Sequence, residues 1–130
     1  MIAAVDPVLL TRAVGFARIG FGILMLARPE VLGSRWIGRQ GALPGTRVIV
    51  RALGMRDLVL GLGAATASGR EQQRWAAASL AADAADLSAT LAGGSAVPLA
   101  GRLGTAVAAG AGVALGGISL AGLSRPSKTT

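Results

Sequence analysis

Six charged side chains stand near the middle of the most apolar stretches of this 130-residue sequence. They are Arg18, Arg51, Arg56, Asp57, Asp83 and Asp86. Carboxylates can take up and release protons, whereas guanidinium groups hold anions or neutralise carboxylates. Because a paired buried charge is far less unfavourable than an unpaired one, we expect these three basic and three acidic groups to pair between helices.

The residue types that are missing restrict the chemistry further. The chain contains no histidine, cysteine or tyrosine. Disulfides, thiolate chemistry, histidine-ligated haem and the usual zinc sites are therefore excluded, as is a triad with a histidine base. An enzyme would have to work with carboxylates alone. We therefore expect no catalytic residues, no metal and no cofactor.

The elements that position these charges are apolar blocks of helical length. The chain is 52% hydrophobic and only 15% charged, against about 25% charged residues in a soluble domain. Four blocks cover residues 8–27, 46–68, 75–93 and 99–123. Each can cross a hydrocarbon core of about 30 Å as a helix. We predict one all-α domain over residues 1–130, an integral membrane four-helix bundle whose short connections make neighbouring helices antiparallel.

The charge distribution indicates lipid rather than nucleic acid as the surrounding partner. The net charge is +7 and aromatic residues make up 3% of the chain, too few for a surface that stacks on bases. The basic residues lie mostly near the block ends, as in multi-pass proteins of the cell membrane. Four spans place both termini on one side. We predict the cytoplasmic side, because Arg70 and Arg74 crowd a short loop and the tail adds Arg125 and Lys128.

Helical spacing places the charges of the third block on one face. Ser79, Asp83, Asp86 and Thr90 follow one another at steps of four, three and four residues, which is one face of a helix. An aspartate stem is too short to bring its carboxylate to the membrane surface. We therefore expect this polar stripe to face the bundle interior.

The first two blocks carry matching stripes. Thr11, Gly15, Arg18 and Gly22 share a face of the first block, and Gly54, Asp57 and Gly61 share a face of the second. Glycines beside the charges let another helix approach closely. Arg56 lies about 100° round the helix from Asp57. We expect those two side chains to point toward different neighbours.

Two further groups of residues are candidates for packing and for lipid contact. A small-residue stripe in the fourth block can pack within the monomer or across an oligomer. It consists of Gly101, Thr105, Ala109, Gly112 and Gly116. Between the first two blocks, Arg35, Trp36 and Arg39 suit the lipid headgroup zone. That segment is either a short interfacial helix or a polar loop.

The residues of the first three blocks resemble a known family. "RIGFGILMLARPEVL" is similar to the first span of DoxX-like four-helix membrane proteins. "RALGMRDLVLGLG" with the later "DAADL" resembles more closely a set of small uncharacterised actinobacterial four-helix membrane proteins. The resemblance implies a four-helix membrane fold. It also implies an accessory role in redox or envelope complexes, although redox chemistry by this chain itself does not fit the lack of cysteine and histidine.

Three functions fit these features. The first is an accessory or interaction subunit of a larger membrane or envelope complex, without chemistry of its own. The second is a small oligomeric transporter or channel, for an anion or a proton-coupled substrate, that uses the buried Arg and Asp side chains. The third is a lipid-binding protein. The expected partners are membrane lipids and either other membrane subunits or further copies of the chain.

Overall fold

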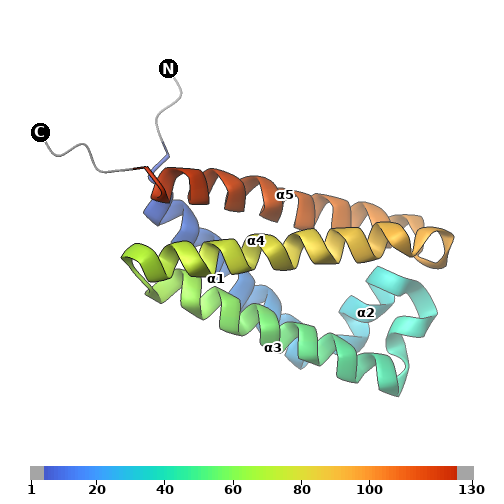
Figure 1. Ribbon diagram of the computed structural model, residues 1–130. Helices are drawn as coiled ribbons and strands as arrows, with labels where there is room; N and C mark the ends of the chain where they lie inside the picture. Colours follow the sequence, from blue (N-terminus) through green and yellow to red (C-terminus); the bar gives the residue numbers. More distant parts are fainter. Residues whose placement is uncertain (1–4, 126–130) are drawn as a thin grey trace, which may run out of the picture.

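The computed structural model describes residues 5–125, and every regular element in that range is helical. The four long helices are α1 (Pro7–Ala27), α3 (Pro44–Thr66), α4 (Gly69–Ala92) and α5 (Leu99–Leu123). The connecting elements are α2 (Pro29–Ile37) and the short 3-10 helices η1 (Gly38–Ala42) and η2 (Gly94–Ala96). In Figure 1, α4 and α5 run side by side, whereas α1 and α3 slope away from them toward the end at which α2 lies. The all-α prediction is confirmed, and the segment left open between helix and loop is α2.

Proline and aspartate set where the helices begin. Asp6 caps α1 because its Oδ1 accepts from the Val8 backbone N–H at 2.8 Å, and Pro7 occupies the first helical position. Proline also opens α2 at Pro29 and α3 at Pro44. Since proline has no N–H to satisfy and a helical φ, it is well tolerated at these positions. The same residues end the preceding segments, because a residue before proline is pushed toward extended backbone.

Two of the predicted blocks differ in their bounds from the helices of the structure. The second block was expected over residues 46–68, but α3 runs two residues earlier at each end. The third was expected over residues 75–93, but α4 begins at Gly69, so the short loop predicted around Arg70 and Arg74 is mostly helix. Its Glu, Gln and Arg residues are strong helix formers, and Gln72 is fully buried and donates to the Val8 carbonyl at 3.4 Å. This polar turn of helix is therefore part of the bundle.

Glycine allows α1 and α3 to touch backbone to backbone. A Cβ added at Gly22 would lie 2.6 Å from the Gly54 carbonyl oxygen, and one added at Gly61 would lie 2.6 Å from that of Gly15. Real side chains never approach so closely, so only glycine fits at these positions. From the Gly15–Gly61 contact to the Gly22–Gly54 contact, the residue numbers rise in α1 and fall in α3. The glycine faces expected from the sequence therefore form an antiparallel contact.

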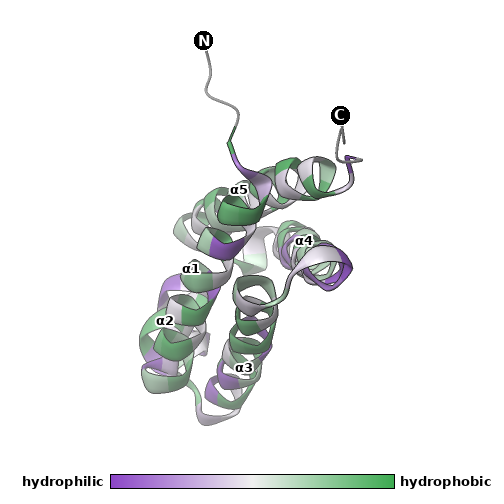
Figure 2. Cartoon of the chain, turned by 90° about the vertical axis from the view of Figure 1, so that its left-hand side faces the viewer, coloured by the Kyte–Doolittle hydropathy of each residue, from purple (hydrophilic) through white to green (hydrophobic). Residues whose placement is uncertain are grey.

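The two ends of the described chain lie together. Figure 2 looks along the helices from the end at which the described chain begins and ends. At this end the start of α1 meets the end of α5, where a Cβ added at Gly122 would lie 2.6 Å from Pro7 Cβ. At the opposite end, Gly101 of α5 packs against the backbone carbonyl of Trp36 in α2. Lys128, used above to predict orientation, is outside the described residues.

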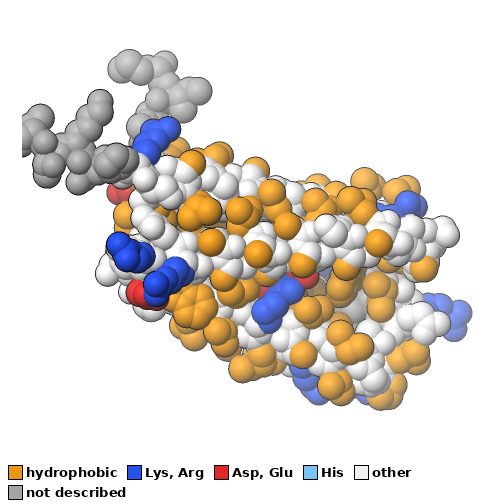
Figure 3. Space-filling view, viewed as in Figure 1, with side chains coloured by type: hydrophobic (Ala, Val, Ile, Leu, Met, Phe, Trp, Pro, Cys, Tyr) orange, Lys and Arg blue, Asp and Glu red, His pale blue; other side chains and the backbone are white. Residues whose placement is uncertain are grey.

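Several polar side chains are buried and many large apolar ones are exposed. Within residues 5–125, the buried polar or charged residues are Thr11, Arg18, Asp57, Gln72, Ser79, Thr90 and Ser119. By contrast, Phe16 is 64% exposed and Val107 is 72% exposed. Figure 3 shows apolar side chains spread over the visible face, with basic groups at both ends of the molecule, along its lower edge and at one place near the middle. Two helices, α1 and α5, are long and apolar enough by length and composition to cross a membrane.

Candidate functional site

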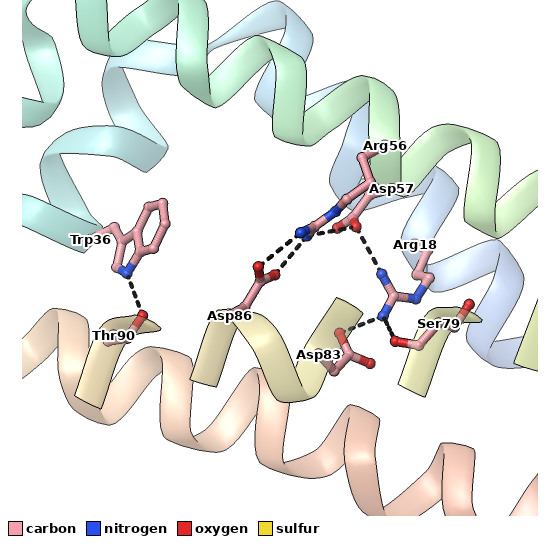
Figure 4. A network of polar contacts seen from close by, with 8 residues as sticks. All are labelled: Arg18, Trp36, Arg56, Asp57, Ser79, Asp83, Asp86 and Thr90. Atoms are coloured by element: carbon pink, nitrogen blue, oxygen red, sulfur yellow. Dashed lines mark hydrogen bonds and ion pairs between the residues drawn. The ribbon is translucent and has the colours of Figure 1, made fainter. Parts of the chain in front are cut away.

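A cluster of five charged residues joins three helices in the middle of the bundle. This charged cluster consists of Arg18 from α1, Arg56 and Asp57 from α3, and Asp83 and Asp86 from α4. Figure 4 shows that its side chains point toward one another from separate helices. The structure thus brings together five of the six charged residues singled out in the sequence.

Arg18 links α1 to both α3 and α4. Its Nη1 donates to Asp57 Oδ1 at 2.8 Å, and its Nη2 forms an ion pair with Asp83 and donates to the Ser79 carbonyl at 3.1 Å. Arg18 is only 7% exposed. It can lie so deep because Gly15 and Gly22, one turn away on either side, let α3 approach α1. The cluster therefore depends on the same close approach that defines the α1–α3 contact.

Arg56 forms the second centre of the charged cluster. Its two terminal nitrogens donate to the two Asp86 oxygens at 2.8 and 2.6 Å, and Nη2 also lies 3.2 Å from Asp57 Oδ1. As expected, Arg56 and Asp57 pair with different neighbours, Arg56 with Asp86 of α4 and Asp57 with Arg18 of α1, and in addition they contact each other. The angle round the helix separates their Cβ atoms, but the long arginine side chain bends back across it. Asp57 consequently accepts from both arginines.

Arg51 is not part of the charged cluster, which corrects the expectation for this residue. Its side chain is exposed, and its Nε donates to the Leu26 carbonyl at 3.4 Å. Leu26 lies in the last turn of α1, where carbonyl groups lack partners within the helix. Arg51 therefore contacts the end of α1. The charged cluster consequently holds two basic and three acidic groups, a net charge of −1.

The polar stripe of α4 continues to both sides of the aspartates. Toward α2, Thr90 Oγ1 accepts from the indole N–H of Trp36 at 3.3 Å. In the other direction, Ser79 Oγ is buried and has no partner among the described residues. It lines a cavity of about 10 Å³ together with Ser119 and Asp83, roughly the space that one water molecule needs. The stripe expected to face inward is therefore a continuous polar row inside the bundle.

Of the three residues expected at the headgroups, Trp36 differs from the other two. Arg35 and Arg39 are exposed at the end of the molecule formed by α2 and η1. Trp36 instead directs its N–H inward to Thr90, so its polar edge ties α2 to α4 (Figure 4). Trp36 therefore has a packing role that its position in the sequence did not indicate.

The small-residue stripe of α5 packs within the chain. Gly112 lies against the Asp83 carboxylate, and Gly116 lies over Leu80. Gly101 contacts Trp36, as described above, while Ala109 is buried and Thr105 is half-buried. These residues therefore pack within the monomer, and packing across an oligomer stays a prediction. A side chain at position 112 would displace Asp83, so this stripe also shapes the charged cluster.

A large groove runs beside the charged cluster, between α1, α2 and α5. Its volume is about 930 Å³, within the usual range of about 300 to 1,000 Å³ for small-molecule sites. Phe21 and Met25 line it from α1, and Leu115 lines it from α5. Its charged lining residues are Arg18, Arg35, Asp57, Asp83 and Asp86. The groove thus has mainly apolar walls, and the ion pairs of the charged cluster lie along its inner side.

The groove exists because α1 and α5 meet at one end only. They touch at Pro7 and Gly122, whereas at the other end α2 lies between them and holds α5 away through the Gly101–Trp36 contact. This groove was not among the features predicted from the sequence. The only sequence signal for it was the small residues of α5, of which Gly104, Ala108 and Ala111 line the groove.

Comparison with family models, curated proteins and solved structures finds no match to this chain. The resemblance to DoxX-like proteins therefore stays a prediction. Within residues 5–125, no group of three or more His, Cys, Asp or Glu side chains could hold a metal ion.

Proposed function

We propose that the chain is a multi-pass membrane protein whose groove binds an amphiphilic small molecule. Support for a membrane setting comes from the reversed burial pattern described above. In water, a large apolar side chain that stays exposed loses the stabilisation of about 1.5 to 3 kcal/mol that burial would give. Contact with lipid tails carries no such penalty. Charged groups at membrane depth are unfavourable unless they face the bundle and pair, which the charged cluster does.

All four long helices have the length to cross. They contain 21 to 25 residues, or about 32 to 38 Å at about 1.5 Å per residue. α3 and α4 are less apolar than α1 and α5, but their central charges point inward. Their outward residues include Val48 and Ile49 in α3 and several alanines in α4. We therefore include α3 and α4 among the spans, with both termini on the cytoplasmic side.

The observation that favours ligand binding is the groove itself. A bundle that needed its charges only for stability would close over them, because small residues on α5 permit close packing. Here the apolar walls and the ion pairs share one open space of about 930 Å³. Apolar walls with a few converging polar groups are typical of small-molecule sites. The geometry therefore favours the binding or transport alternatives over a purely structural subunit.

Native mass spectrometry of gently extracted protein tests this proposal. Gly104 lines the groove, and a Cβ added there meets no atom within 4 Å. Gly104→Phe should fill the groove without disturbing the bundle. We expect a bound small molecule on the wild type that is absent from this variant. Gly110→Phe is the matched control, since Gly110 is on the same helix, has the same open space and is not part of the groove lining. Ligand retained by Gly104→Phe would refute the proposal.

An accessory subunit is the second candidate, and the completeness of the ion pairs favours it. Each of the five charged residues has an oppositely charged partner within the chain, so the charged cluster is stable without a ligand. In that case a helix of another membrane protein would occupy the groove. A protein in place of a small molecule in the mass spectrum, lost in Gly104→Phe, would favour this candidate.

A further inference from the structure

The inner part of the groove, beside the charged cluster, carries a surplus of negative charge. Two guanidinium groups face three carboxylates in the charged cluster. The only other charged residue among the described groove-lining residues is Arg35, which is exposed at the α2 end. Arg51, which would have balanced the charges, contacts the end of α1 instead. The inner part of the groove therefore holds a net charge of −1 beside apolar walls.

The surplus is centred on Asp83. Asp86 receives both terminal nitrogens of Arg56, and Asp57 accepts from two arginines. Asp83 has a single ion pair, through Oδ1 to Arg18, and its Oδ2 lies toward Gly112 on the groove wall. The Asp83 side chain is 14% exposed and lines the groove. Asp83 is thus the carboxylate least neutralised by the protein.

We propose that the groove selects an amphiphilic organic cation, with its charged group beside Asp83 and its apolar body against Phe21, Met25 and Leu115. This inference rests on the proposed function, that the groove binds an amphiphile. A carboxylate only accepts hydrogen bonds and attracts positive charge. In an apolar setting a cation brings the charge of the inner groove to zero, whereas an anion brings it to −2. The apolar walls favour a hydrophobic cation over a strongly hydrated inorganic one.

Two ions of nearly equal shape and opposite charge test whether the groove prefers a positively or a negatively charged ligand. Tetraphenylphosphonium and tetraphenylborate would be titrated into the full chain in nanodiscs of zwitterionic lipid, with partition into protein-free nanodiscs subtracted. We expect the phosphonium ion to bind at least about tenfold more tightly, the ratio that a modest charge-dependent difference in binding free energy produces. Equal affinities, or tighter binding of the borate, would overturn the inference.

Three variants separate this inference from the proposed function. Asp83→Asn brings the inner groove to neutrality and should lower the ratio of the two affinities by about tenfold. Glu71→Gln, an equal charge change at an exposed pair with Arg74, should leave the ratio unchanged. Gly104→Phe should abolish binding of both ions. Loss of both ions in Gly104→Phe without any charge preference in the wild type overturns the inference alone. No binding, or binding that Gly104→Phe does not affect, overturns the proposed function as well.

Discussion

Arg18 Nη1 lies 2.8 Å from Asp57 Oδ1, and this ion pair joins α1 to α3 where their glycine faces touch backbone to backbone. The same guanidinium reaches Asp83 on α4. One residue thus connects three helices near their centres. Its removal should affect the whole bundle rather than one contact.

Arg18→Gln should destabilise the protein by about 3 to 5 kcal/mol, because it leaves Asp83 buried without its partner. Neutralising one of the two carboxylates that pair with Arg18 should restore part of the lost stability, and the amount restored should differ between the two. Asp83→Asn should restore more than Asp57→Asn, because Asp57 keeps Arg56 at 3.2 Å whereas Asp83 has no second arginine. Unfolding free energies in mixed micelles would give the comparison. Equal rescue by both second changes would show that the pairing with Arg56 is ineffective.

The α1–α3 contact predicts a difference between two neighbouring glycines. A Cβ at Gly22 would press against the α3 backbone, whereas one at Gly20 meets no atom within 4 Å. Gly22→Ala should therefore destabilise the protein by about 1 to 3 kcal/mol. Gly20→Ala should be neutral or stabilise it by up to about 1 kcal/mol through helix propensity. The same unfolding measurement checks both. Similar values for the two variants would contradict the backbone contact.

The proposed topology can be tested by cysteine labelling, since the natural chain contains no cysteine. Ser68, Ser95 and Ser124 are exposed in the connections or at a helix end. Each would be changed to cysteine singly and treated in intact cells with a membrane-impermeant maleimide. Ser95→Cys should react from outside, and the other two should react only after permeabilisation. Labelling of Ser68→Cys and Ser95→Cys from the same side would show that α4 does not cross.

Periodicity was sufficient to predict the inward faces because the relevant side chains are short. An aspartate carboxylate stays near its own Cβ, so Asp57, Asp83 and Asp86 lie where helical spacing places them. Arginine is different, because its charge lies several bonds from the backbone. Arg56 reaches back to Asp57, and Arg51 reaches the end of α1. The charge balance of the cluster therefore could not be read from the positions of the residues.

The groove could not be predicted from helix faces either. It depends on the separation of α1 and α5, which contacts far apart in sequence determine: Pro7 with Gly122 at one end and Trp36 with Gly101 at the other. Each contact is a close approach to a glycine, and glycine-rich helices contain many possible ones. Local patterns gave the helices and their inward faces, but the distance between two helices is set by the whole bundle.

The Arg56–Asp86 pair offers a last test of whether the charged cluster is only structural. Both side chains are about 30% exposed, so removing the pair should be less unfavourable than breaking the Arg18 pairs. Arg56→Gln alone leaves Asp86 unpaired and should destabilise the protein, and adding Asp86→Asn should recover most of that loss. Unfolding free energies of the single and double variants measure this recovery.

The double variant is informative because it leaves the net charge of the cluster at −1, carried by Arg18, Asp57 and Asp83. If the net charge of the cluster determines which ion binds in the groove, the double variant should keep the preference for tetraphenylphosphonium over tetraphenylborate. Asp83→Asn should lose this preference at comparable stability. If the charges only hold the helices together, both variants should bind the two ions in the same ratio as the wild type. A preference lost in the double variant but kept in Asp83→Asn would place the surplus charge on Asp86 instead.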